Sequence, residues 1–323
     1  MIEVLFQIQS GNRIQKVSGV TMSIRNMARL LIGLLLVSII VYRLNPETIA
    51  STIITARLPY LLFAVIIYSL TFLMLSTRWR MILRSMGQNL PLVSAYQAFA
   101  GGMIISDMTP GRVGDLTRPL LVKEQVDLCK GFASVVIDRY TDILTMFILG
   151  VSGIALLAQR SSHMIIAFFV ILMIVFGLSA FWLKRRQALK LIDRLDYSRV
   201  TEIAHALDSA LDSITDIKGL ILRSMLLTAC AWVFQALRIT LIAKSMGYDV
   251  PLPILILMQP LVSALALIPI TVSGLGLVEG GLAVLLSGFG IPTAAGMSIA
   301  LMDRIITVAF HILVGGRFAL KAL

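Results

Sequence analysis

Six apolar stretches, each long enough to cross a lipid bilayer as a helix, dominate this sequence. A membrane-spanning helix needs roughly 20 predominantly apolar residues. The composition agrees, because 58% of the 323 residues are hydrophobic and 14% are charged, whereas soluble domains average roughly 45–50% apolar and about 25% charged residues. The sequence therefore predicts an all-α, polytopic transmembrane helical bundle. The predicted full spans are residues 28–44, 58–77, 131–157, 163–183, 224–245 and 293–315.

Two further apolar regions, residues 92–121 and 252–289, are interrupted near their middles by glycine and proline. Each region could form two spans joined by a tight turn. We favour a re-entrant helical hairpin for each, since unwound backbone at membrane depth is tolerated where protein or a cavity satisfies its polar groups. The interrupting residues are Pro110, Gly111, Gly114, Pro269, Gly274 and Gly276.

Clusters of basic residues beside four of the six spans give the chain an orientation. Basic residues concentrate in the cytoplasmic loops of membrane proteins, which explains the net charge of +11 without nucleic-acid binding. Both termini are then cytoplasmic, and residues 58–157 and 224–323 become oppositely directed copies of span, hairpin and span. Such an inverted repeat is typical of alternating-access carriers. The clusters are Arg25 and Arg29, then Arg78, Arg80 and Arg84, then Lys184, Arg185 and Arg186, then Arg317 and Lys321.

The remaining segments complete a single transmembrane domain over residues 28–323, preceded by a polar leader over residues 1–27. Residues 28–57 contain the first span and a loop. Residues 158–223 contain a connecting span and a cytoplasmic segment whose apolar residues recur at helical spacing. That segment forms either amphipathic helices on the membrane surface or a solvated linker helix between the repeats.

The same charged pattern follows the break in each repeat. Asp115 closes the first glycine-rich break and precedes Arg139 by 24 positions, and Glu279 closes the second and precedes Arg304 by 25 positions. Each arginine directly follows an aspartate inside an apolar run. A charge there costs about 2.5–3.5 kcal/mol on insertion scales, which indicates a functional role. Interrupted segments at corresponding places in two halves indicate a transporter's binding site.

Arg112, Asp115 and Arg118 recur every three residues after the first break, so a helix would place them on one face. The planar guanidinium suits a phosphate or a carboxylate, and a helix that begins after Gly111 would direct N–H groups at an anion. This pattern favours a phospholipid headgroup site. The alternative is a charge cluster on a cytoplasmic loop that anchors the hairpin.

The other charges inside apolar runs need partners. Asp138 and Asp142 share a helix face, so they could pair with Arg112 or Arg118, bind a cation, or hold the hairpin in place. Arg238 lies deep in the span 224–245 and needs a carboxylate partner, for which Glu279 and Asp303 are the candidates. For His311, a packed, hydrogen-bonded role is favoured over a proton relay. The predicted substrate-binding residues are Arg112, Asp115, Arg118, Asp138, Arg139, Asp142, Glu279, Asp303 and Arg304.

Enzymatic chemistry receives little support from the sequence. The two cysteines, Cys129 and Cys230, have no metal-binding spacing, and the glycines of the second break do not follow a strand as those of a nucleotide loop would. We therefore predict no catalytic residues, no metal and no cofactor.

These motifs resemble the membrane domain of the lysylphosphatidylglycerol synthase/flippase family, over about residues 28–318. In two respects the chain departs from that family. Asp115 and Asp138 stand where the family more often has Glu, and Val278 stands where Arg is common. The motifs that carry the resemblance are Pro110-Gly111-Arg112-x-Gly114-Asp115-x-x-Arg118, Asp138-Arg139-x-x-Asp142, Ser273-Gly274-Leu275-Gly276-x-x-Glu279, and Arg304.

The resemblance implies a stand-alone lipid flippase, without the family's synthase domain, in a bacterial or archaeal cytoplasmic membrane. Its substrate would be a phospholipid or another lipid-linked headgroup, and a homodimer is compatible with the family. Two alternatives remain. One is a membrane scaffold subunit for a separate lipid-modifying synthase or glycosyltransferase. The other is an intramembrane lipid-headgroup enzyme that uses Asp138 and Asp142 with a metal.

Overall fold

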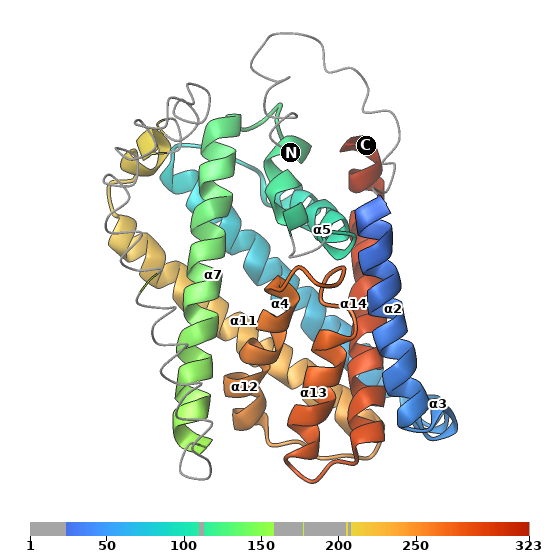
Figure 1. The fold of residues 1–323 in the computed structure, drawn as a ribbon. Coiled ribbons are helices and arrows are strands. Elements are labelled where there is room, and N and C mark those ends of the chain that lie inside the picture. Colours follow the sequence, from blue (N-terminus) through green and yellow to red (C-terminus); the bar gives the residue numbers. More distant parts are fainter. Residues whose placement is uncertain (1–23, 110–112, 158–176, 178–204, 206–207, 323) are drawn as a thin grey trace.

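The structure is a computed structural model, and it describes residues 24–109, 113–157, 177, 205 and 208–322 (Figure 1). Several sequence predictions fall outside the described residues. They are the leader over residues 1–23, the span 163–183 apart from residue 177, the amphipathic segment as far as residue 204, and the break residues Pro110, Gly111 and Arg112.

The regular elements of the described residues are helices, which confirms the predicted all-α class. Four predicted spans each lie within one long helix, namely α4, α7, α11 and α14. The helices are α2 (Ile24–Arg43), α3 (Pro46–Ile54), α4 (Leu58–Ser85), α5 (Leu92–Asp107), η1 (Val113–Thr117), α6 (Arg118–Leu121), α7 (Leu128–Leu157), α11 (Ile217–Ser245), α12 (Leu252–Ala264), η3 (Leu265–Leu267), α13 (Leu277–Ser287) and α14 (Thr293–Ala322).

Within the described residues, α4, α11 and α14 are long and apolar enough to cross a membrane, and α2 with α3 makes a fourth candidate bent by 93°. The loop predicted after the first span was wrong, because it contains helix α3. Asn45 lies at φ 68° and turns the chain, and its side chain accepts a hydrogen bond from Glu47 N at 3.1 Å. Pro46 then starts the new helix, a position proline favours.

Both glycine-rich regions are broken where the sequence predicts. Helix α5 ends at Asp107 and is followed by η1 and the four-residue α6, while α12 is separated from α13 by η3 and turns. Gly274 and Gly276 adopt φ 70° and 85°, conformations that favour glycine. The second break thus needs these two glycines for its backbone path.

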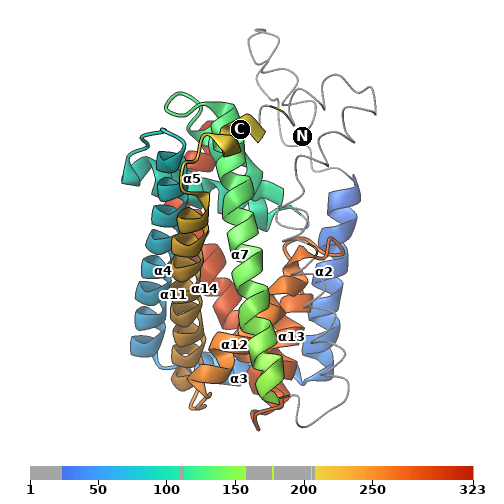
Figure 2. The same ribbon diagram turned by 90° about the vertical axis from the view of Figure 1, so that its left-hand side faces the viewer.

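The two halves of the chain interlock. Helix α4 packs along α11, while α5 packs on α14 and α12 packs on α7, so each half places a short helix against the last helix of the other. Figures 1 and 2 show α5 toward one end of the bundle and α12 and α13 toward the other. The start of α2 and the end of α14 lie at the same end as α5 (Figure 1).

The outward faces of the helices are apolar. Large side chains stand exposed on α2, α4, α11 and α14, and they include Leu31, Leu35, Phe63, Leu226 and Leu313. So many exposed large apolar side chains are unusual for a soluble monomer and suit contact with lipid. The polar side chains gather instead in the centre of the bundle.

Small residues allow α5 and α14 to approach closely. A Cβ added at Gly315 of α14 would lie 2.5 Å from the carbonyl carbon of Ala100 in α5, whereas one added at Gly316 would meet nothing within 4 Å. Glycine at such a contact is typical of packed membrane helices.

We therefore expect Gly315→Ala to destabilise the protein by roughly 1–3 kcal/mol, the usual cost of overpacking. Gly316→Ala, at the next position of the same helix, is the matched control and should be close to neutral. Thermal unfolding of both variants in detergent measures the difference. Equal melting temperatures for the two variants would contradict this packing.

Candidate functional site

Helix α4 contributes a buried arginine to a group of charges in the first half. Arg78 Nε donates to Asp138 Oδ1 of α7 at 2.8 Å, and both side chains are fully buried. Arg78 also donates to Asp142 Oδ1 at 3.2 Å and to the hydroxyl of Thr228. The prediction that Arg78 follows the second span was therefore wrong, because this residue is buried within α4. Helix α4 continues to Ser85, beyond the predicted span, and two carboxylates offset the arginine's charge.

The segment after the first break is tied to α7 by further ion pairs. Arg118 Nη2 bonds Asp115 Oδ1 and its Nη1 bonds Asp138 Oδ2, each at 2.8 Å, and its guanidinium lies 3.9 Å from the centroid of the Phe99 ring. Arg139 Nη1 lies 3.0 Å from Asp115 Oδ2. The predicted pairing of Asp138 with Arg118 is confirmed. Because both oxygens of Asp138 accept from arginines, this carboxylate is poorly placed to bind a cation.

The second half contains a parallel set. Arg238 of α11 forms a two-point ion pair with Asp303 of α14, with Nε–Oδ1 at 2.7 Å and Nη2–Oδ2 at 3.1 Å. Asp303 is thus the partner of Arg238, one of the two carboxylates predicted for it. Glu279 instead pairs with Arg304, Nε to Oε1, at 2.7 Å, and accepts a hydrogen bond from Gly276 N at 2.7 Å.

The two sets correspond residue by residue. Arg78–Asp138 matches Arg238–Asp303, and Asp115–Arg139 matches Glu279–Arg304. In each half, the first long helix supplies an arginine to the last, and the segment after the break supplies a carboxylate. The sets differ at two positions. Leu282 follows Glu279 at the spacing at which Arg118 follows Asp115. Thr307 follows Asp303 at the spacing at which Asp142 follows Asp138.

The two breaks meet inside the bundle. Ser273 N donates to Thr109 O at 3.4 Å, and Ser273 Oγ lies 3.5 Å from Asp107 Oδ1. Arg304 Nη2 donates to Ser273 O at 3.1 Å. The second ion-pair set is thereby connected to the contact between the breaks. Ser273, at φ 50°, is one of two residues other than glycine with positive φ among the described residues.

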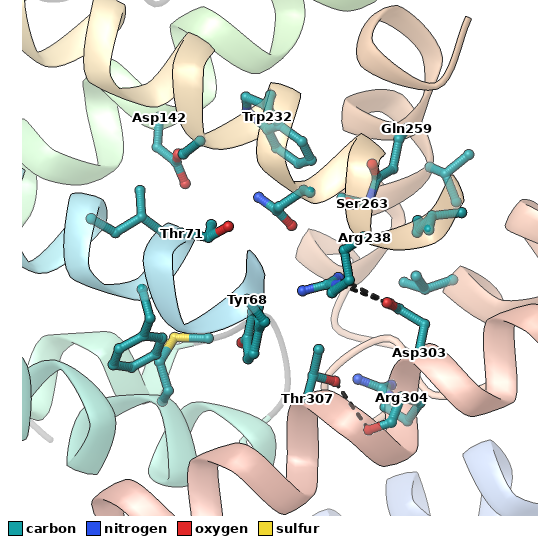
Figure 3. A pocket seen from close by; sticks show the side chains of 18 of the residues that line it. Tyr68, Thr71, Asp142, Trp232, Arg238, Gln259, Ser263, Asp303, Arg304 and Thr307 are labelled. Carbon is teal, nitrogen blue, oxygen red and sulfur yellow. Dashed lines mark hydrogen bonds and ion pairs between the residues drawn. The ribbon is translucent and has the colours of Figure 1, made fainter. Parts of the chain in front are cut away.

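A cavity of about 140 Å³ lies between the two ion-pair sets (Figure 3). Its wall includes Tyr68, Asp142, Trp232, Arg238 and Gln259, which surround a common space in the figure. A water molecule occupies about 30 Å³ in the liquid, so the cavity has room for a few waters or a small polar group.

Several polar atoms on this wall have no hydrogen-bond partner among the described residues. They include the donors Arg78 Nη2, Trp232 Nε1 and Arg238 Nη1 and the acceptor Gln259 Oε1. All four side chains are more than nine-tenths buried. Because an unpaired buried polar group costs about 1–3 kcal/mol, these atoms indicate a site that receives a polar ligand.

The cavity brings together five of the nine predicted substrate-binding residues: Arg139, Asp142, Glu279, Asp303 and Arg304. Asp115, Arg118 and Asp138 do not line it and lie within the ion pairs of the first half. The ninth, Arg112, lies outside the described residues. Gly114 packs against α5, where an added Cβ would lie 2.2 Å from Ser106 N.

Sequence reasoning missed other residues of the cavity wall, notably Arg78, Asp107, Trp232 and Gln259. One signal could have identified Arg78. Arg78 precedes Asp138 by 60 positions, and Arg238 precedes Asp303 by 65. The charged pattern shared by the two halves therefore already begins in the long helix before the broken region. Trp232 and Gln259 have no such signal, because they form no repeated pattern.

The fold and the cavity define a polytopic helical membrane protein with an internal polar site. The sequence profile of the lysylphosphatidylglycerol synthase TM region matches residues 26–315. The chain therefore belongs to this family, and the resemblance drawn from its motifs is confirmed.

The chain is also similar to UPF0104 membrane proteins of three archaea. Identity to the protein of Pyrococcus horikoshii is 22% over 327 residues, covering 90% of this chain and 96% of the relative. The protein of Methanothermobacter thermautotrophicus is 22% identical over 304 residues, with coverages of 86% and 90%. That of Methanocaldococcus jannaschii is 21% identical over 308 residues, with coverages of 88% and 91%.

We expect Arg78→Gln to destabilise the protein by about 3–5 kcal/mol, because the fully buried Asp138 Oδ1 loses its arginine partner. Arg223→Gln is a matched control, since Arg223 also lies 2.8 Å from an aspartate, Asp216, but both side chains are exposed. Exposed pairs contribute less than about 1 kcal/mol. Denaturation in detergent measures both, and similar losses for the two variants would show that burial of the Arg78 pairs is unimportant.

Proposed function

We propose that residues 58–157 and 224–323 form an inverted repeat, with six spans in the whole chain and two re-entrant hairpins. Three observations support this architecture. The ion-pair sets correspond position by position, the broken regions lie toward opposite ends of the bundle (Figures 1 and 2), and their breaks touch at Thr109 and Ser273. The membrane around this bundle would be a bacterial or archaeal cytoplasmic membrane, with both termini in the cytoplasm.

We further propose that the protein is a lipid flippase or transporter that moves a phospholipid or another lipid with an anionic headgroup between leaflets. The observation that carries this proposal is the set of unpartnered donors, Arg78 Nη2, Trp232 Nε1 and Arg238 Nη1, on a cavity between the two halves. Guanidinium and N–H donors suit phosphate oxygens. Binding at the interface of repeats, where half-helices end, is the arrangement of alternating-access carriers.

The cavity residues divide into two roles in this mechanism. Arg238 and Trp232 bind the phosphate, and Gln259 and Asp142 accept hydrogen bonds from hydroxyl or amino groups of the headgroup. The pairs Asp115–Arg139 and Glu279–Arg304 hold the hairpins against α7 and α14. Arg112, Arg118 and Arg304 were predicted as headgroup ligands, and the pairing of Arg304 with Glu279 now assigns it to holding the second hairpin. We now assign Arg118 to holding the first hairpin, since its guanidinium bonds two carboxylates, and Arg112 stays a prediction.

The size of the cavity limits how a lipid can be carried. Pockets for whole drug-sized ligands are about 300–1,000 Å³, whereas this one is about 140 Å³. We therefore propose that the headgroup alone enters and that the acyl chains stay in the bilayer through a lateral opening. This arrangement avoids placing the polar headgroup in hydrocarbon, which is the main barrier to unassisted lipid exchange.

A leaflet-exposure assay in proteoliposomes, with fluorescent phosphatidylglycerol, its lysyl derivative and a polyprenyl phosphate, tests the proposal. Trp232→Phe and Gln259→Leu each remove one unpartnered polar atom without breaking an ion pair. We expect wild type to move at least one lipid and each variant to be roughly tenfold slower or more, because a hydrogen bond to a charged group contributes about 1.5–3 kcal/mol.

Gln125→Leu, at an exposed position outside the cavity, is the matched control and should transport normally. Wild-type rates in both cavity variants would remove the cavity from the mechanism. Absence of movement for every lipid, with folded wild-type protein, would defeat the flippase proposal and favour a scaffold for a separate lipid-modifying enzyme.

A further inference from the structure

A chain of three titratable side chains on the cavity wall has no role in the mechanism above. His311 Nδ1 lies 2.5 Å from Asp107 Oδ2, and His311 Nε2 lies 2.6 Å from the hydroxyl of Tyr68. The three residues come from α14, α5 and α4, and all of them line the cavity. Both nitrogens of the imidazole are therefore held by oxygen atoms inside the bundle.

This chain contacts the proposed phosphate-binding groups and the hairpin tip. The Arg238 guanidinium lies 4.5 Å from the centroid of the Tyr68 ring. At the other end, Asp107 Oδ1 lies 3.5 Å from Ser273 Oγ, in the contact between the two breaks. A change in the charge of the chain would therefore act on both the bound headgroup and the hairpin contact.

Aromatic rings pack beside the chain. The Phe72 ring lies 5.9 Å from the His311 ring and the Phe310 ring lies 5.0 Å from that of Tyr68, measured between centroids. His311 itself is 3% exposed. In such surroundings electrostatic interactions are stronger than in water, so an uncompensated charge is costly.

In the ion-pair network that surrounds and extends beyond the cavity, carboxylates outnumber arginines by one. The buried network of described residues contains five arginines (Arg78, Arg118, Arg139, Arg238 and Arg304) and six carboxylates (Asp107, Asp115, Asp138, Asp142, Glu279 and Asp303). Arginine is always protonated, so a neutral His311 leaves one carboxylate uncompensated. A proton on His311 balances the network.

The groups that face His311 come from several helices. Asp107 of α5 and Tyr68 of α4 touch it directly. Of the other helices packed against α14, α6 and α3 carry Arg118 and Glu47, which do not line the cavity. Besides Asp107, the charged groups that share the cavity with His311 are Arg78, Arg139, Asp142, Arg238 and Glu279, together with Asp303 and Arg304 of its own helix.

We propose that His311, with Asp107 and Tyr68, is a proton-binding site whose protonation is coupled to binding of the lipid phosphate. An ionised Asp107 can only accept, so Nδ1 carries a hydrogen and, in neutral His311, Nε2 accepts from the Tyr68 hydroxyl. A proton taken from water then binds Nε2. Tyr68 becomes the acceptor of that N–H, and its own O–H turns to donate to a phosphate oxygen in the cavity.

Lipid binding and proton binding therefore favour each other. The incoming phosphate adds a negative charge that the imidazolium offsets, and the imidazolium releases a donor for the phosphate. Such coupling is reciprocal, so lipid must promote proton uptake as much as a proton promotes lipid binding. Histidine is suited to this role because its charge ordinarily changes between about pH 5 and 8. The inference rests on the proposed lipid-binding function of the cavity.

The test uses purified full-length protein in detergent and dihexanoyl phosphatidylglycerol, whose phosphodiester does not change charge in this range. Affinity is measured between pH 5.5 and 8.5, and proton uptake on lipid addition is followed in weak buffer with a pH indicator. Wild type should bind more tightly as pH falls, by up to about tenfold per pH unit, the limit for one linked proton. Uptake should approach one proton per lipid bound.

His311→Gln should bind lipid with an affinity that no longer changes with pH and should take up no proton. Tyr68→Phe should keep proton uptake but bind the lipid more weakly at low pH. His205→Gln, at an exposed position, should behave as wild type. Should His311→Gln fail to fold, Asp107→Asn, which removes the uncompensated carboxylate, must abolish the proton uptake instead.

These measurements distinguish failure of the proton-binding site from failure of the proposed flippase function. Wild type that binds and moves lipid without any pH dependence or proton uptake overturns the proton site and leaves the flippase proposal standing. Uptake that persists in folded His311→Gln also overturns it. Wild type that neither binds nor moves any lipid overturns the proposed function itself.

Discussion

Arginine–carboxylate pairing at the centre of an apolar bundle is the interaction on which this structure depends. A single arginine or aspartate in such surroundings would be expelled or neutralised, so every charge there must be placed within a few ångströms of its opposite. Arg78 and Arg238 reach Asp138 and Asp303 across the α4–α7 and α11–α14 contacts. These pairs fix which helices adjoin, and they also leave individual N–H groups without a partner on residues that line the cavity. The same geometry therefore specifies the fold and equips its polar interior.

Much of this arrangement follows from local sequence. Length and hydropathy alone predict α4, α7, α11 and α14, because a long apolar helix in lipid has few alternatives. The glycines predict the second break, since Gly274 and Gly276 adopt positive φ. The sequence predicted Glu279 or Asp303 as the partner of Arg238, because a charge inside an apolar run needs an opposite charge nearby. These predictions succeed because the governing constraint acts over a few residues or concerns an unusually expensive group.

Other features depend on tertiary packing and escaped prediction. Arg78 stands at the end of an apolar run, where arginine usually marks the cytoplasmic boundary, and its burial follows from the position of α7. Helix α3 is nine residues long, too short for hydropathy to distinguish it from a loop. Trp232 and Gln259 acquire their role from the cavity that other helices create around them. The sequence therefore predicted the charged framework of the site better than the neutral polar groups that complete it.

The segments that follow the two breaks are attached to their neighbouring long helices by different numbers of ion pairs. On α7, the first break segment is bound by Arg118 to Asp138 and by Asp115 to Arg139. On α14, the corresponding attachment is Glu279 with Arg304, and Leu282 stands where Arg118 would be. Parting the second segment from its helix disrupts fewer ionic contacts than parting the first. Two corresponding sets of ion pairs thus hold their break segments unequally, and the second segment is the one that charge restrains less.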